Sequence, residues 1–293
     1  MMKKICMISF VLHFAAAGSG CASGNDKKAA EAAPAKVYMT RDISPAGMKA
    51  VYEALGRKAE GKKVAVKLST GEPGGNNFLQ PALIGDLVKS VKGTIVECNT
   101  AYGGAIKNIS IGIASSAGKA WIHSAGKTED TEKLWSSLPA QDDFLESMAE
   151  AAKAIAAHCG ERILYISVMN NLSVDCDCDA HPEPPRMGDI GILASLDPVA
   201  LDQACVDLVY ASPDEGKVHL IERMESRHGI HTLEHAEAIG AGSTSWSIWT
   251  NSGSGTSRGR HPRSLGMSFF CPRRNGAIRP GRAGARVCSQ NVH

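Results

Sequence analysis

The chain has 293 residues, of which 43% are hydrophobic and 21% charged, and a formal net charge of +2. This composition is that of a globular protein with one large or two ordinary domains, and it excludes a wholly disordered chain, a collagen and a polytopic membrane protein. The charge is unevenly distributed, because all 30 acidic residues lie at or before Glu237, whereas the last 51 residues carry eight Arg and no Lys, Asp or Glu.

The first 20 residues have the pattern of a bacterial export signal. Two lysines precede an apolar run from Ile5 to Ala17, which is too short to span a bilayer. Small residues then lead to Cys21, as in a lipoprotein signal with Cys21 as the lipidated first residue; simple secretion and an unprocessed start are the alternatives. Residues 21–36 are rich in Ala and Lys and are expected to form a flexible tether. We therefore expect an exported lipoprotein, periplasmic or outer-membrane-anchored, whose only membrane contact is its lipid.

Between residues 37 and 242 the hydrophobic pattern alternates between helix and strand. The pair Ser44-Pro45, a good cap followed by proline at the first helical position, predicts the first helix. The next elements are a strand over residues 63–68, a helix over 81–91 and a strand over 93–98. Strand, helix and strand at this spacing predict a parallel crossover unit.

The same alternation returns in the second half of the chain. The expected elements are a helix over 142–157, strands over 162–169 and 190–194, a helix opened by Asp197-Pro198 that runs to Tyr210, and helices over 213–227 and 232–239. Strands separated by helices favour the α/β class. We predict a mixed or mostly parallel sheet with helices on both faces.

The strongest local signal for chemistry is the cysteine segment, Asp175-Cys176-Asp177-Cys178-Asp179-Ala180-His181. Two thiols two residues apart lie on one face of an extended segment, so both sulfurs can reach one ion, and His181 can fold back toward it. Thiolates with an imidazole suit Zn²⁺ or an iron–sulfur centre. The neighbouring carboxylates would raise the pKa of both thiols, which favours a ligand role over nucleophilic catalysis. Cys205 is a candidate further ligand; the alternatives are a polar loop without metal and Cys205 as a small core residue.

A second group, the lysine–histidine cluster, consists of Lys107, Asn108, Lys119 and His123, interspersed with glycines. Lysine and asparagine beside glycines can hold an anion or a cofactor carboxylate, because backbone N–H groups approach a ligand closely where no Cβ intervenes. The segment has neither a Walker A nor a G-x-G-x-x-G pattern, so nucleotide binding has no specific support. A purely structural role for the glycines stays open.

His231 and His235 are four residues apart, a helical spacing that metalloenzymes use. Glu234 is misplaced for the zinc-protease motif, so we expect surface or packing histidines. No serine has the sequence context of a nucleophile elbow, and the pattern leaves open whether the protein is an enzyme.

Several stretches resemble the domain of unknown function family 362, in its branch labelled uncharacterised iron–sulfur centre protein. They are residues 64–73, 106–108, 112–115, 118–119, 123–124, 170–179, 189–199, 202–205 and 231–236, and they are spread across most of the span from residue 37 to residue 242. The resemblance implies an iron–sulfur or metal centre but no agreed reaction. Some relatives carry an appended ferredoxin-like module, whose Cys-x₂-Cys-x₂-Cys spacing this sequence lacks.

Two features depart from the family pattern. Relatives place several tens of residues between the regions that match Gly104 and Lys107, so we expect an internal deletion near residues 104/105 and an incomplete sheet. Relatives also close with a short aromatic, acidic end, whereas residues 243–293 are rich in Ser, Gly and Arg. A frameshifted, disordered, non-native tail explains this composition best; a real basic appendage and an assembled chimera are the alternatives. We expect no nucleic-acid partner.

Two functions follow as hypotheses. The first is an exported protein whose cysteine segment, with Cys205, binds a metal or an iron–sulfur centre and serves a small molecule or a redox partner. Because cluster assembly is cytosolic and export passes an unfolded chain, Zn²⁺ is at least as plausible as a cluster. The second is a non-enzymatic lipoprotein that binds a small anion or cofactor at the lysine–histidine cluster. A degenerate copy without function is a third hypothesis.

Overall fold

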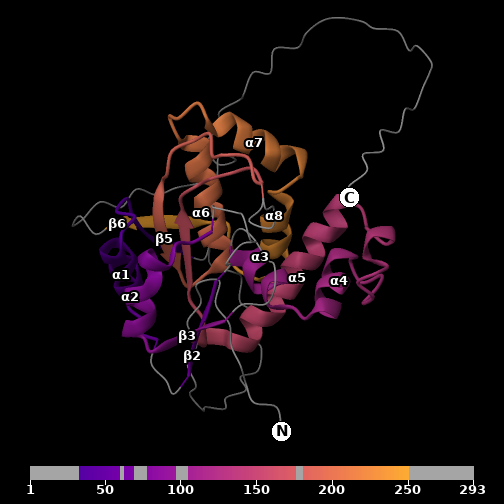
Figure 1. Cartoon of the computed structure of the whole chain (residues 1–293), viewed down its shortest axis with the longest axis horizontal. Helices are drawn as coiled ribbons and strands as arrows, with labels where there is room; N and C mark the ends of the chain where they lie inside the picture. The colour runs from indigo at the N-terminus through magenta and orange to yellow at the C-terminus, as the bar shows by residue number, and fades with distance from the viewer. Residues whose placement is uncertain (1–32, 60–62, 69–77, 97–104, 176–180, 251–293) are drawn as a thin grey trace, which may run out of the picture.

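The computed structural model describes residues 33–59, 63–68, 78–96, 105–175 and 181–250, which form a mixed α/β domain (Figure 1). Its strands are β1 (Ala35–Thr40), β2 (Val64–Lys67), β3 (Gly93–Val96), β4 (Tyr165–Met169), β5 (Gly191–Ser195) and β6 (Trp246–Thr250). Its α-helices are α1 (Pro45–Ala54), α2 (Pro81–Ser90), α3 (Ala105–Ile109), α4 (Ser116–His123), α5 (Gln141–Cys159), α6 (Pro198–Ala211), α7 (Lys217–Ser226) and α8 (His231–Ala238). Three short 3₁₀ helices are η1 (Ile111–Ile113), η2 (Leu134–Ser136) and η3 (Gly160–Arg162). None of the described helices is long and apolar enough to cross a membrane.

Four strands form the central sheet in the order β4-β5-β1-β6. β5 is antiparallel to both β4 and β1, whereas β6 is parallel to β1. β2 and β3 form a separate parallel pair. The prediction of a mixed sheet in an α/β domain is therefore confirmed, although most pairings in the central sheet are antiparallel.

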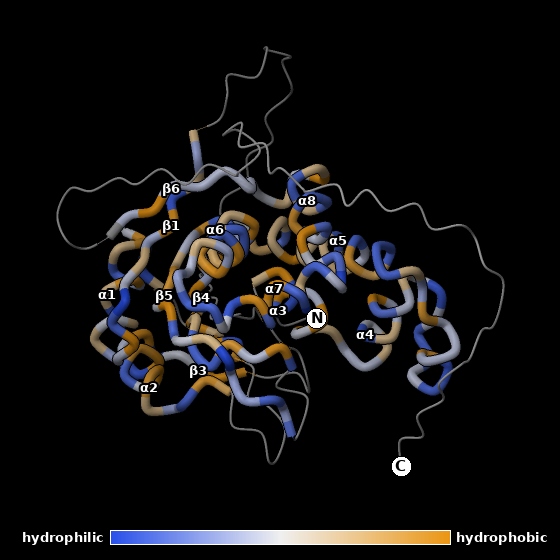
Figure 2. The backbone as a smooth tube through the Cα atoms, turned by 90° about the horizontal axis from the view of Figure 1, so that it is seen from above, coloured by the Kyte–Doolittle hydropathy of each residue, from blue (hydrophilic) through white to orange (hydrophobic). Residues whose placement is uncertain are grey.

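β5 lies at the centre of the hydrophobic core. All five of its residues are buried, and Ile192, Leu193 and Ala194 have no exposed surface. Successive side chains of a strand point to opposite faces, so a continuous buried run needs cover on both faces. Figure 2 shows α1 on one side of β5 and α6 on the other, and both helices contact the strand. The expected helices on both faces are confirmed.

The predicted crossover unit is also confirmed. β2 and β3 pair in parallel from Val64 opposite Gly93 to Lys67 opposite Val96, and α2 connects them. α2 begins at Pro81, as the sequence predicts, and packs against α1 and β3. The residues around the expected deletion, 97–104, lie outside the described residues.

Both predicted boundaries of the domain need correction. β1 begins at Ala35, inside the segment expected to be tether, and β6 extends the domain from residue 242 to Thr250. Trp246 and Ile248 of β6 are 5% and 8% exposed, so this strand contributes to the core. The Ser-, Gly- and Arg-rich composition of residues 243–293 gave no signal for this strand. The expected signal and the tail after residue 250 lie outside the described residues.

Asp197 holds the chain that enters β6. Its Oδ2 accepts the Ser243 N–H at 2.9 Å, while its Oδ1 accepts the Val199 and Ala200 N–H groups at the start of α6. A Cβ at Gly242 would lie 2.2 Å from Asp197 Oδ1, so this close approach requires glycine. The start of α6 and the entry to β6 are thus bound to one carboxylate.

Replacement of Trp246 by alanine tests whether β6 belongs to the folded domain. The indole is buried and its N–H donates to Asp207 at 2.8 Å, so Trp246→Ala should lower the free energy of unfolding by about 3–5 kcal/mol. Urea unfolding of the full chain measures the loss. The control is Trp249→Ala, because Trp249 is 40% exposed and contacts Lys36 through a cation–π interaction, a change expected to cost about 1 kcal/mol or less. Equal, small losses for both variants would contradict the docking of β6.

Candidate functional site

The cysteine segment lies in a loop whose two ends are tied together. Cys176 and Cys178 are outside the described residues, but the chain on both sides is described. The Ser173 hydroxyl donates to the Glu183 carbonyl at 2.7 Å, and the Glu183 N–H donates to Asp175 Oδ2 at 2.9 Å. These two bonds join the described residues on the two sides of the cysteines, which we call the base of the loop.

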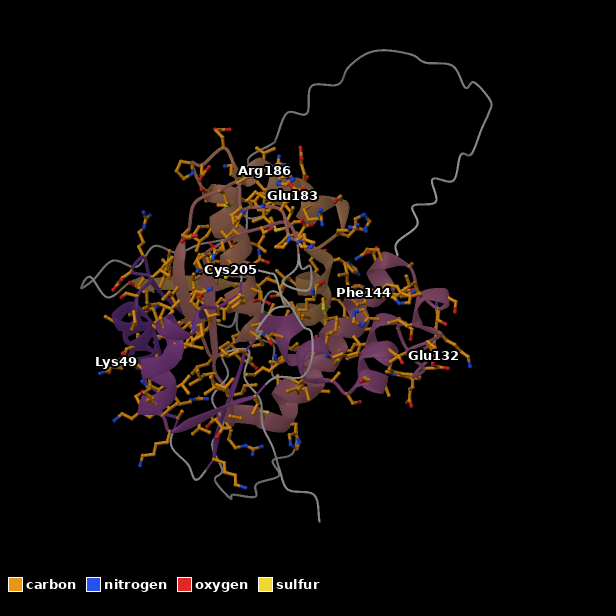
Figure 3. The ribbon with its side chains drawn as sticks, viewed as in Figure 1. Lys49, Glu132, Phe144, Glu183, Arg186 and Cys205 are labelled. Carbon is orange, nitrogen blue, oxygen red and sulfur yellow. The ribbon has the colours of Figure 1, made fainter. Side chains whose placement is uncertain are left out.

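Charges from α7 surround the base of this loop. Arg223 donates to the Val174 carbonyl at 3.2 Å and lies 3.5 Å from Asp175 Oδ1. Arg186 donates to Glu183 at 2.8 Å, and these two side chains lie together in Figure 3. Because Arg223 compensates the charge of Asp175, one of the three carboxylates expected to disfavour thiolates has a cationic partner.

The donor set of the loop fits a thiophilic metal by its chemistry. Two cysteines and His181, which is exposed and lies two residues before Glu183, match the ligand types of Zn²⁺ and iron–sulfur sites. Within the described residues, no three His, Cys, Asp or Glu side chains converge to hold a metal ion. Since both loop cysteines fall outside those residues, the predicted ligand set stays a prediction.

Cys205 lies on α6 at a distance from the loop base. Figure 3 shows it in the middle of the domain, well apart from Glu183 and Arg186. Burial, and then the negative charge of Asp202, raise the pKa of the Cys205 thiol, although a hydrogen bond with Ser167 of β4 opposes the rise. Cys205 is half-buried and packs against the hydrophobic core, as the alternative of a small core residue expects; its role as a further metal ligand stays a prediction.

The lysine–histidine cluster is brought together on α5. Lys107 and Asn108 lie on α3, Lys119 and His123 lie on α4, and both helices pack against α5. Burial lowers the pKa of His123, while its hydrogen bond to the Lys119 carbonyl at 2.7 Å opposes this. The positive charges of Lys107 and Lys119 lower it further, which places both lysines within electrostatic reach of the ring. Two lysine charges therefore act on the imidazole of His123.

Two further features give this cluster a defined shape. The His123 ring stacks on Phe144 of α5, with ring centroids 5.3 Å apart and planes inclined by 19°. The side-chain oxygen of Asn108 is buried and accepts no hydrogen bond from any described residue. A buried acceptor without a donor costs free energy, so a ligand that carries an N–H or O–H would be stabilised there.

Sequence reasoning missed Asp202 as the residue that positions this cluster. Its two carboxylate oxygens accept the Ala105 and Ile106 N–H groups at 2.7 and 2.9 Å, across 97 and 96 residues of chain. Asp202 thereby joins α6 to the first turn of α3, which carries Lys107. No local pattern predicts this contact, because it depends on two helices meeting in space.

Lys67 was also missed. Its side chain is fully buried at the carboxyl end of β2, where the ammonium donates to the Leu68 carbonyl. The sequence did offer a signal, because Lys67 lies within the apolar strand run Val64–Leu68. A lysine is almost never fully buried without polar partners, so its place in a buried strand points to a special role. Ends of parallel strands are where α/β proteins bind ligands, which makes Lys67 a candidate site residue.

The titration of Asp202 should appear in the stability of the protein. Burial raises its pKa from the ordinary 3.8 to about 6, against the lowering effect of the Ile106 and Ala105 N–H groups. The folded state therefore binds the proton before the unfolded chain does, so this contribution to stability is present below about pH 4 and lost as the pH rises through about 6. Asp202→Asn should remove roughly 1–3 kcal/mol of pH-dependent stability between about pH 4.5 and 7.5, measured by urea unfolding.

Asp214 provides a control of opposite sign. The Gly188 and Gly216 N–H groups, which it accepts at 2.7 and 2.8 Å, lower its pKa. Its contribution to stability is present near neutral pH and is lost as the pH falls. Asp214→Asn should therefore reduce the loss of stability that the protein shows on acidification. A pH profile of Asp202→Asn that matches the wild type would contradict the assignment of Asp202 as a buried acid.

Comparison with known proteins finds one match, to a family model. No curated protein and no solved structure matches the chain. Residues 96–207 match the family model described as Domain of unknown function (DUF362), a stretch that runs from the end of β3 into α6 and contains the lysine–histidine cluster and the cysteine segment. This part of the chain is therefore similar to the DUF362 family.

Proposed function

We propose that this protein is an exported lipoprotein of the DUF362 family that holds a metal or iron–sulfur centre in the cysteine segment. Cys176, Cys178 and His181 are the proposed ligands. The single observation that supports the proposal best is the closed base of the loop, where Ser173, Asp175 and Glu183 hold the two ends together. A short closed loop lowers the entropic cost of bringing three donors to one ion.

Zn²⁺ and an iron–sulfur centre would give the site different chemistry. Bound Zn²⁺ supplies Lewis acidity or structural stability, and a cluster supplies electron transfer to a redox partner. The chain's own groups orient the loop: Arg223 binds the Val174 carbonyl and compensates the charge of Asp175. The proposed export favours Zn²⁺ or a centre acquired outside the cytosol, with the lipid on Cys21 as the only membrane contact.

Metal analysis of the purified protein tests this proposal. We expect about one metal site per chain in the wild type, and its loss in the double variant Cys176→Ser/Cys178→Ser, because both sulfur donors are removed. Visible absorbance distinguishes an iron–sulfur centre from Zn²⁺. The matched control is Cys205→Ala, which removes a thiol away from the loop and should leave the metal content unchanged. Equal metal content in all three proteins would contradict the proposed ligands.

The lysine–histidine cluster supports a second candidate function, the binding of a small anion. The specific observation is that burial, and then the charges of Lys107 and Lys119, lower the pKa of His123, while the Asn108 oxygen accepts no hydrogen bond from the described residues. An anion that also carries a hydroxyl or amide donor complements both features. This function requires no metal and no reaction.

Thermal unfolding with phosphate or citrate tests the anion site. Either probe should raise the Tm of metal-free protein by several degrees, at about 2–4 °C per kcal/mol of binding. Lys107→Gln/Lys119→Gln should abolish the shift, because the variant removes both positive charges near His123. Lys127→Gln changes an exposed lysine and should retain the shift. A folded protein that binds neither metal nor anion would instead support the third hypothesis, a degenerate copy.

A further inference from the structure

A stripe of carboxylates on α5 faces a row of histidines at α8. Asp142, Glu146 and Glu150 follow one another at intervals of four residues, so they share one face of α5. His231 and His235 lie four residues apart on α8, which packs along α5. His231 is the first residue of α8, whereas the sequence placed it before the helix. Three carboxylates of α5 therefore face the imidazoles of α8 where the two helices pack together.

Each histidine of the row contacts a carboxylate of the stripe. His231 Nε2 lies 2.8 Å from Glu146 Oε1, a hydrogen-bond distance. His228, just before α8, places Nδ1 2.9 Å from Asp142 Oδ1. These contacts link helices whose residues are about 85 positions apart in the chain. They are thus tertiary contacts that hold α8 against α5.

His235 lies between two carboxylates. Its Nδ1 is 3.7 Å from Glu146 Oε1, and its Nε2 is 3.6 Å from Glu150 Oε1. Nε2 is also buried and has no hydrogen-bond partner among the described residues. A neutral imidazole has one N–H and one lone pair, so one of its nitrogens would direct a lone pair at a carboxylate. Only the imidazolium form offers a donor to both.

The other charged groups around α8 have different roles. Lys153 of α5 donates to the Ile239 carbonyl at the end of α8. On α6, which also packs on α8, Asp202 accepts N–H groups of α3 and Asp207 accepts the Trp246 indole N–H. On α8 itself, Glu237 accepts the Thr244 N–H and hydroxyl, and Glu234 adds another negative charge. Among the ion pairs of the described residues, the carboxylates of the stripe pair only with histidines.

We propose that α8 is a proton-operated latch, which docks firmly on α5 when His231 and His235 are protonated and loosens when they are neutral. In the neutral form, Glu146 and Glu150 repel each other at helical spacing without compensation. When α8 loosens, the segment that precedes β6 is affected as well, because Glu237 of α8 accepts the Thr244 N–H. The latch is independent of the proposed metal and anion sites.

Hydrogen exchange of the full chain tests the latch. With a chelator present and exchange rates corrected for pH, the amides of α8 should gain severalfold protection as the pH falls from about 7.5 to about 5.5, because protonated histidines pair with the carboxylates of α5. His235→Gln should abolish most of the gain. His158→Gln, which removes an exposed histidine at the end of α5, should leave it intact.

A second variant covers the case that His235→Gln fails to fold. Glu150 is 65% exposed in its side chain, so Glu150→Gln should fold and should reduce the gain in protection, because one of the two carboxylates at His235 is lost. Protection of α8 that is independent of pH, or that changes equally in the wild type, His158→Gln and Glu150→Gln, would overturn the proposal. A gain that appears only with added Zn²⁺ would overturn it as well, in favour of a metal at these residues.

Discussion

The carboxylate of Asp197 connects the elements on which the rest of the domain depends. It follows β5, caps α6 through the Val199 and Ala200 N–H groups, and binds the Ser243 N–H ahead of β6. Burial raises its pKa, and the three N–H groups oppose that rise, so a desolvated anion is stabilised by donors from both directions of the chain. This one residue fixes where α6 begins and where the C-terminal strand enters the sheet.

α6 in turn organises the surroundings of the candidate sites. Its residues Leu201 and Ala204 are fully buried, while Asp202 on the same helix reaches the first turn of α3. α3 then places Lys107 near His123 of α4. The matched family region contains this whole sequence of contacts. The cysteine segment depends on a different support, the hydrogen bonds between Ser173 and Glu183 at its base and Arg223 from α7.

The elements predicted from the sequence are those with strong local signals. α6 was predicted from Asp197-Pro198, and α2 and α5 from their amphipathic patterns, because caps and periodicity act within a few residues. β1, α3, α4 and β6 were not predicted, since helices of five and eight residues and short strands at the two ends of the domain carry too little local signal. Of the candidate sites, the lysine–histidine cluster was predicted as a group, whereas its link to Asp202 was not.

The sequence by itself determined the α/β class, the similarity of residues 96–207 to one family, and the positions of most helices and strands. Only the tertiary structure decided that β6 pairs with β1, that Cys205 is a half-buried thiol near Ser167, and that histidines of α8 contact the carboxylates of α5. The physical reason is the separation along the chain of the residues that interact. Caps, turns and periodic burial depend on neighbours in the chain, whereas charge pairing, burial of a thiol and strand order depend on residues some 40 to 210 positions apart.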